Sequence, residues 1–306
     1  MRVAGVAGAA LMLWVTASEA VACACGCGVF EVGAGSMLPT GDAASFFVRY
    51  DFLDQNRNWS GTSRAPAADN DDKRIITDFI ALGAQFRIDD NWTAMVEVPV
   101  WNRLFKTGTD GGTQTFRHAA LGDIRLMTSY TGLSDATTST GFIAGVKLAT
   151  GDTGYPHFDP DVSIGSGSTD ALLGIYHSGP LSDDGLFVWF GNVLWDKPLA
   201  TRAVYKPGSE VDGALGVFYG GFTAGNLQIT PMLQAVIASR ARDSGAEADP
   251  PNTGYTRLLL SPGVEFTWNK WSVYADVQFP IYQYVIGNQL VARQQFNLVL
   301  SYALGS

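Results

Sequence analysis

The chain has 306 residues, of which 16% are charged, and its formal net charge is −9. A soluble globular domain usually has about 25% charged residues, so this content is low, whereas 35 glycines and 12% aromatic residues suit a wall that faces lipid. The acidic balance comes without any run of basic residues, which excludes nucleic acid as an expected partner.

Residues 1–22 have the features of a secretory signal peptide. Arg2 supplies a positive charge, Val3–Val15 is apolar, and Ala20-Val21-Ala22 offers a cleavage site. A retained helical anchor is less favoured, because the apolar run is shorter than the roughly 20 residues that span a bilayer. Cleavage after Ser18-Glu19-Ala20 and acylation of Cys23 remain open alternatives.

The next segment, residues 23–43, is expected to lie in the periplasm or to fold back into the barrel as a plug. It holds all the cysteines of the chain, Cys23, Cys25 and Cys27. Three thiolates in a Cys-x-Cys-x-Cys pattern suit copper(I) or zinc, so they are candidate metal ligands. The usual zinc and redox spacing is Cys-x-x-Cys, and a disulfide or a neutral tail is therefore the alternative.

Residues 44–306 alternate apolar and polar side chains with a period of two, which indicates β-strands. A soluble sandwich would give the same alternation, but here short connections alternate with long polar ones, as in outer-membrane barrels. About twelve antiparallel strands, an even number as in single-chain bacterial barrels, are expected near residues 44–54, 74–88, 92–102, 120–131, 141–149, 168–178, 186–196, 211–220, 227–239, 255–268, 271–284 and 290–304. The long connections are expected near residues 54–72, 102–120, 150–168, 197–210 and 240–254.

Aromatic side chains gather at the predicted strand ends, which favours two girdles at the headgroup level of a membrane. Those beside short turns or the C-terminus are Trp92, Tyr130, Trp268, Trp271 and Tyr302, and those beside long connections are Trp101, Phe105 and Trp195. Prolines inside strands remove a ladder donor and indicate bulges or bends; they are Pro99, Pro231, Pro262 and Pro280.

The strand faces opposite the lipid carry the charged residues, because a charge that faces lipid near the midplane costs several kcal/mol. The candidate lumen-lining residues are Arg49, Asp51, Glu97, Asp123, Arg125, Lys147, Arg257, Glu265 and Asp276. They could line a polar translocation path or form a closed network of ion pairs that fills the barrel. Because acids and bases are balanced, strong ion selectivity is not expected.

Several segments recur in the order found in a known family: GDIRL from Gly122, GVKLATGDTGY from Gly145, IGSGSTD from Ile164, SPGVEF from Ser261 and VQFPIYQYVIGNQL from Val277. Over roughly residues 44–304 the chain therefore resembles the phenol-degradation meta-pathway family of outer-membrane barrels, which is similar to the long-chain fatty-acid and aromatic-hydrocarbon transporters. The resemblance implies uptake of aromatic compounds. Ala149, where that family usually has proline, and the cysteine segment are departures.

The sequence thus predicts an all-β, transmembrane antiparallel barrel in the bacterial outer membrane, a channel or transporter for small molecules with aromatic or hydrophobic ones as candidates. Expected partners are the lipid bilayer, the solute, the barrel-assembly machinery and, at the N-terminal segment, a periplasmic protein. The alternative is a barrel anchor whose cysteine cluster handles metal or redox chemistry. An enzyme is not expected, because His118, His157 and His177 are dispersed and form no Ser–His constellation.

Overall fold

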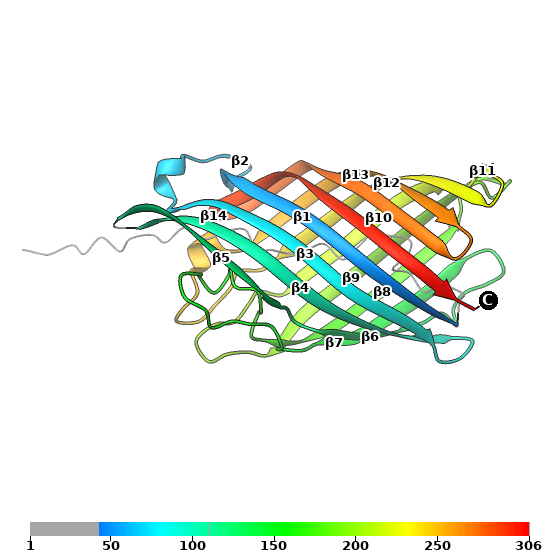
Figure 1. Cartoon of the computed structure of the whole chain (residues 1–306), viewed down its shortest axis with the longest axis horizontal. Coiled ribbons are helices and arrows are strands. Elements are labelled where there is room, and N and C mark those ends of the chain that lie inside the picture. The colour runs from blue at the N-terminus through cyan, green and yellow to red at the C-terminus, as the bar shows by residue number, and fades with distance from the viewer. Residues whose placement is uncertain (1–42, 110, 306) are drawn as a thin grey trace, which may run out of the picture.

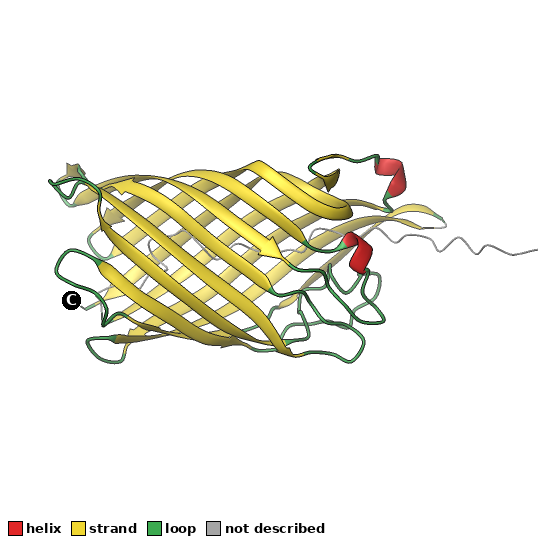
Figure 2. Cartoon of the chain, turned by 180° about the vertical axis from the view of Figure 1, so that it is seen from behind, coloured by secondary structure: helices red, strands yellow, loops and turns green. Residues whose placement is uncertain are grey.

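The computed structural model describes residues 43–109 and 111–305. They form one antiparallel sheet that closes into a tilted barrel, because β10 pairs with both β9 and β12 while β1 pairs with both β3 and β14 (Figures 1 and 2). The wall elements are β1 (Ala44–Gly61), β3 (Asp72–Arg87), β4 (Trp92–Thr109), β6 (Arg125–Tyr130), β7 (Ser139–Lys147), β8 (Thr169–Pro180), β9 (Phe187–Ala200), β10 (Glu210–Tyr219), β12 (Leu227–Arg240), β13 (Tyr255–Trp268) and β14 (Trp271–Leu304). Shorter elements are β2 (Ser63–Arg64), β5 (Gly112–Leu121), β11 (Phe222–Ala224) and the 3₁₀ turns η2 (Ala67–Asp69) and η3 (Pro250–Asn252).

The last element, β14, folds back on itself. Its first part pairs with β13 and its second part with β1, and Gly287 has a φ of 74° between them. The Ala303 amide donates to the Lys270 carbonyl at 2.9 Å, and the rings of Trp271 and Tyr302 lie 4.7 Å apart. The two parts of β14 are therefore neighbouring legs of a hairpin. Ten wall elements each run once along the described barrel wall, and β14 runs along it twice, which agrees with the even strand number that the sequence predicts. The predicted fold class, an all-β antiparallel barrel, is confirmed.

The short and the long connections lie at opposite ends of the barrel. The short turns between wall strands lie at the end that carries the C-terminus, and the long connections lie at the opposite end (Figures 1 and 2). The predicted loop 102–120 is wrong, however, because residues 102–109 and 112–120 form a β4–β5 hairpin. The predicted loop 54–72 likewise begins too early, since β1 continues to Gly61. A polar segment can remain a strand beyond the lipid, where both of its faces meet water.

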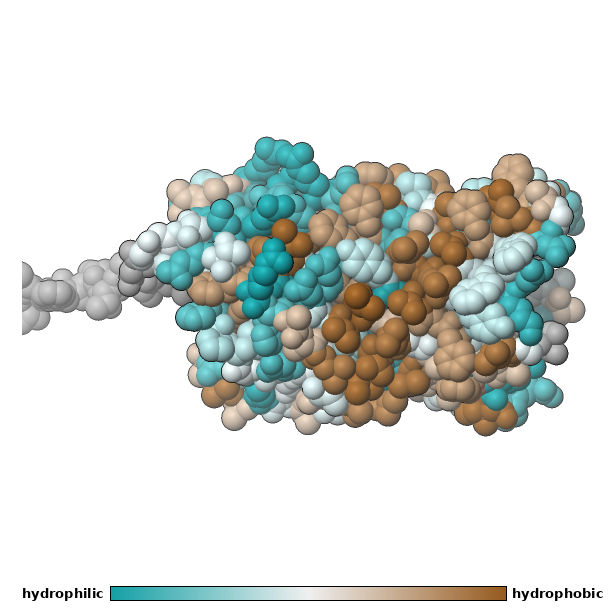
Figure 3. All heavy atoms as spheres, in the orientation of Figure 1, coloured by the Kyte–Doolittle hydropathy of each residue, from teal (hydrophilic) through white to brown (hydrophobic). Residues whose placement is uncertain are grey.

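The outer surface carries an apolar band that faces the viewer over the middle of the barrel, with hydrophilic residues toward the end with long loops (Figure 3). Exposed apolar residues of the wall include Leu82, Ile175, Leu215, Leu233 and Ile281. At the short-turn end, aromatic rings contact one another in the groups Trp92–Tyr130–Phe142, Phe187–Tyr219–Phe222 and Trp271–Tyr302. This arrangement is that of an interfacial aromatic girdle.

The girdle predicted at the other end is wrong for two of its three residues. Phe105 is 1% exposed and packs against Phe158 in the interior, and Trp101 lies edge-on to the buried Phe79 at 4.8 Å. Both share the strand face of the buried Glu97, because alternate residues of a strand point to the same side. Trp195, which is 41% exposed, does face outward.

The strand prolines have different effects on the wall. Pro280 lies at a register shift between β13 and β14, so a bulge is confirmed there. Pro99 lies where β4 changes its neighbour from β6 to β5. The β12–β13 ladder passes Pro231 and Pro262 without a register shift, so of the two predicted alternatives, a bulge or a bend, the bulge is excluded in that ladder. The register there is fixed by the neighbouring amides, which can still donate.

The predicted signal peptide 1–22 and the cysteines Cys23, Cys25 and Cys27 lie outside the described residues, as does the predicted segment 23–43 except for Ala43. Within the described ranges, no helix is both long and apolar enough to cross a membrane.

Candidate functional site

The predicted charged residues of β1, β4 and β6 meet inside the barrel. Glu97 is fully buried, and its Oε1 accepts from Arg49 Nη2 at 3.4 Å and from Arg125 Nη1 at 3.2 Å. Arg49 Nε also lies 3.1 Å from Asp51 Oδ2, and Asn297 donates to the other oxygen of Asp51 at 2.5 Å. Two carboxylates, Asp51 and Glu97, thus balance two guanidinium groups that would otherwise be costly to bury.

A second group of charges continues around the wall at the adjacent strands. Lys147 Nζ lies 2.5 Å from Asp170 Oδ2 and 2.8 Å from Asp196 Oδ2, so two carboxylates share one ammonium. Farther round, Tyr255 donates to Glu210 at 2.5 Å, and the guanidinium of Arg257 lies 4.4 Å from the centre of the Tyr255 ring. These residues connect β7, β8, β9, β10 and β13 through polar contacts.

The predicted residue Asp276 belongs to a separate hydrogen-bond cluster. Its Oδ2 accepts from Tyr274 Oη at 2.7 Å, from Ser261 Oγ at 2.9 Å and from Gln234 Nε2 at 3.2 Å. Glu265 accepts a long bond of 3.5 Å from Thr267, and no ion pair between residues 43–109 and 111–305 joins it to the other predicted residues.

Toward the short-turn end, large apolar side chains enter the interior. Phe47 and Phe190 are each 3% exposed and belong to one cluster with Met232 and Val236. Phe47 lies directly across the β1–β3 ladder from Gly83, and a Cβ at Gly83 would lie only 1.9 Å from its ring. Glycine is therefore required opposite this ring, which narrows the interior.

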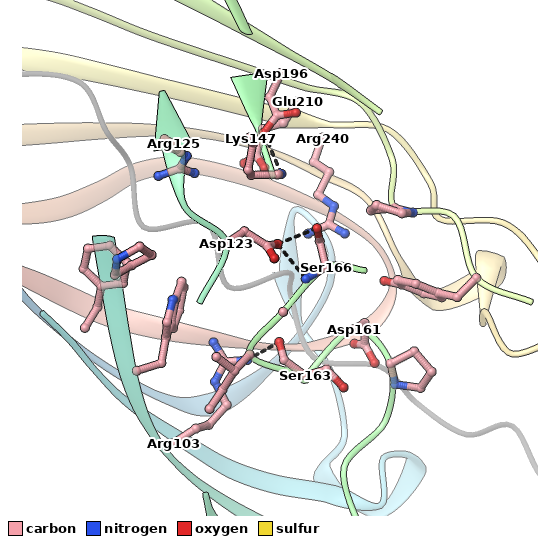
Figure 4. Close-up of a pocket in the computed structure, with 18 of the residues that line it drawn as sticks. Arg103, Asp123, Arg125, Lys147, Asp161, Ser163, Ser166, Asp196, Glu210 and Arg240 are labelled. Atoms are coloured by element: carbon pink, nitrogen blue, oxygen red, sulfur yellow. Dashed lines mark hydrogen bonds and ion pairs between the residues drawn. The ribbon is translucent and has the colours of Figure 1, made fainter. Parts of the chain in front are cut away.

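The long connection after β7, residues 148–168, lies at the end of the barrel that carries the long connections and reaches Asp123. The Asp123 carboxylate accepts from Gly151 N at 2.9 Å, from Ser166 N at 2.8 Å and from Ser166 Oγ at 2.6 Å (Figure 4). Asp123 follows the β5 strand and is 8% exposed. Its role in the structure is thus to fasten both ends of this loop to the wall.

The β5 strand holds the loop from its outer side. His118 Nε2 lies 2.9 Å from Asp152 Oδ2, and the His118 ring stacks on Tyr155 at 3.7 Å. Phe116 stacks in the same way on His157 at 4.3 Å. The hydrogen bond from His118 is the largest of the effects that lower the pKa of the Asp152 carboxyl below its ordinary value.

Between the loop and the wall is a cavity of about 120 Å³. Figure 4 shows its polar lining, with Arg103 and Ser163 on one side and Lys147, Asp196, Glu210 and Arg240 on the other. Arg103 is fully buried and donates through Nη1 to the carbonyl oxygens of Val162 and Ser163, the latter at 3.1 Å. Its guanidinium also lies 4.8 Å from the centre of the Trp101 ring.

The predicted set thus includes Asp123, Arg125 and Lys147 of the cavity but misses part of its lining. The missed charged residues of the lining are Arg103, Asp161, Asp196, Glu210, Asp212 and Arg240. Strand alternation would have identified Arg103, which has the same parity as Glu97 on β4. Asp161 could not be found in this way, because it lies in a loop. In the part of the chain that the structure describes, no group of three or more His, Cys, Asp or Glu residues is arranged to hold a metal ion.

No protein-family model matches the chain, and no curated protein matches it. Solved structures do match: an outer-membrane channel from Pseudomonas putida F1 has a TM-score of 0.66 at 13% identity, over 90% of this chain and 100% of that one. The β domain of the Bordetella autotransporter Brka has a TM-score of 0.50 at 11% identity, over 86% and 100%.

At these identities the likeness shows the fold alone. The chain has the closed antiparallel β-barrel fold of bacterial outer-membrane proteins, with a channel among the structures it resembles.

Proposed function

We propose that the protein is a channel of the bacterial outer membrane that admits small molecules through a passage controlled by the loop 148–168. The observation that carries this proposal is the cavity of about 120 Å³ enclosed between that loop and a charged inner wall. Fixed charges around a water-filled constriction select solutes by size and charge. The lipid bilayer, the transported solute and the barrel-assembly machinery are the partners that this role requires.

The two sequence-based alternatives for the inner charges apply to different groups of residues. Glu97 pairs with Arg49 and with Arg125, of which only Arg125 lines the cavity, and this favours a structural role for Arg49 and Glu97. The residues around the cavity, with Asp123 holding the loop, favour a translocation path. We assign the passage to this second group.

The proposed solutes are small molecules, with aromatic or hydrophobic ones as the first candidates. Support comes from the motif resemblance and from the pairing of the Trp101 and Phe79 rings at the cavity. Pro99, where β4 changes neighbours, offers a second exit through the wall.

The experiment that tests the channel is single-channel recording of the refolded mature chain in a planar bilayer. A passage under the loop predicts ionic steps that become larger when residues 153–163 are replaced by a short Gly-Ser linker. A matched replacement of the short-turn residues 133–137 should leave the conductance unchanged. A folded barrel that is silent in both the native and the shortened form would overturn the proposal.

A further inference from the structure

The cavity contains one cation whose bonding differs from that of its neighbours. Arg125 and Lys147 each face a carboxylate within 3.2 Å, and Arg240 lies 2.9 Å from Asp243. Arg103, which is fully buried, takes part in none of the ion pairs among the described residues. Within the ranges that the structure describes, its hydrogen-bond acceptors are therefore neutral carbonyl groups.

The bonding of Arg103 is also incomplete. Nη1 donates to the Val162 and Ser163 carbonyls, whereas Nε and Nη2 have no hydrogen-bond partner among the described residues. Nε and Nη2 form one edge of the planar guanidinium, the edge that binds a carboxylate through two parallel hydrogen bonds. A buried N–H without an acceptor is unfavourable, and more so on a charged group.

The aromatic residues around the Arg103 guanidinium suit a ligand with a flat, apolar part. The Trp101 ring lies 4.8 Å from the Arg103 guanidinium and edge-on to Phe79, and both rings line the cavity. Asp123, a carboxylate of the cavity lining, accepts hydrogen bonds from three donors of the loop. The acids in the lining are thus largely engaged, while Arg103 retains donors for an anion.

Resting on the proposed channel function, we propose that Arg103 is the binding site for the carboxylate of the transported solute. The carboxylate binds the Nε–Nη2 edge through two parallel hydrogen bonds, and by neutralising the guanidinium charge it weakens the bonds from Nη1 to the Val162 and Ser163 carbonyls. The segment 160–163 is then released from the wall, and the passage opens. The solute class is a small monocarboxylate with a flat apolar body.

The test uses the refolded full-length barrel with benzoate as the probe and benzamide, which has the same shape without charge, as the control. Isothermal titration should show benzoate binding at least ten times more tightly than benzamide. Arg103→Lys, which keeps the charge but loses the planar edge, should abolish that difference. Lys106→Gln, which removes an exposed cation from the same strand, should preserve it.

Loop release is measured separately by hydrogen exchange, which should become faster in residues 160–166 when benzoate is added to the native protein and remain unchanged in Arg103→Lys. A change in gel mobility on heating establishes that each variant is folded. If Arg103→Lys does not fold, Arg103→Met replaces it in the test. Equal affinities for benzoate and benzamide, or unchanged exchange on binding, would overturn the inference. Arg103-dependent binding to a barrel that never conducts would refute the channel and leave this site standing.

Discussion

The attachment of the loop 148–168 at Asp123 is the most direct point at which to perturb the proposed passage. Asp123→Ala removes the acceptor of three hydrogen bonds, one from Gly151 and two from Ser166. At a net value of about 1 kcal/mol for each bond, the closed loop loses about 3 kcal/mol. Since 1.4 kcal/mol corresponds to a factor of ten, its equilibrium shifts toward opening by roughly a hundredfold.

This shift should be visible in planar-bilayer recordings as longer open times and a larger mean conductance, and in hydrogen exchange as lost protection over residues 148–168. Asp184→Ala is the matched control, because Asp184 also accepts bonds from its own turn but lies at the opposite end of the barrel. If Asp123→Ala is folded and matches the native protein in both measurements, then Asp123 does not hold the loop closed and the reasoning fails.

Three further predictions concern stability and pH. Gly83→Val places carbon atoms in the space of the Phe47 ring and should lower the free energy of unfolding in urea by about 1–3 kcal/mol; an unchanged urea midpoint would contradict this packing. Glu97→Gln leaves two buried guanidinium groups without their shared carboxylate and should cost about 3 kcal/mol in the same assay, whereas an effect near zero would argue against a structural ion pair. The folded-state pKa of Asp152 is lowered, so its contribution to holding the loop is present above the ordinary carboxyl pKa and is lost as pH falls through the lowered value. Conductance should therefore rise in that acidic range, and His118→Ala should abolish the rise; a pH response that persists in the variant would refute the assignment.

The sequence alone was enough to predict which strand face meets lipid. The alternation of Phe46, Val48 and Tyr50 with Phe47, Arg49 and Asp51 identifies both faces of β1, and the burial of the second set confirms it. The same rule, applied strictly, would have placed Trp101 inside instead of in a girdle. That error came from reading proximity to a polar segment as a membrane interface.

The contacts that form the cavity could not be derived from the sequence. Arg103 and Val162 are 59 residues apart, and Asp123 and Ser166 are 43 residues apart. Strand periodicity fixes only the side to which a residue points, because it reflects local backbone geometry. The position of loop 148–168 depends instead on closure of the barrel, which brings β4, β5 and the loop together. Among the described residues, this tertiary arrangement gives Arg125 a carboxylate partner and Arg103 carbonyl partners.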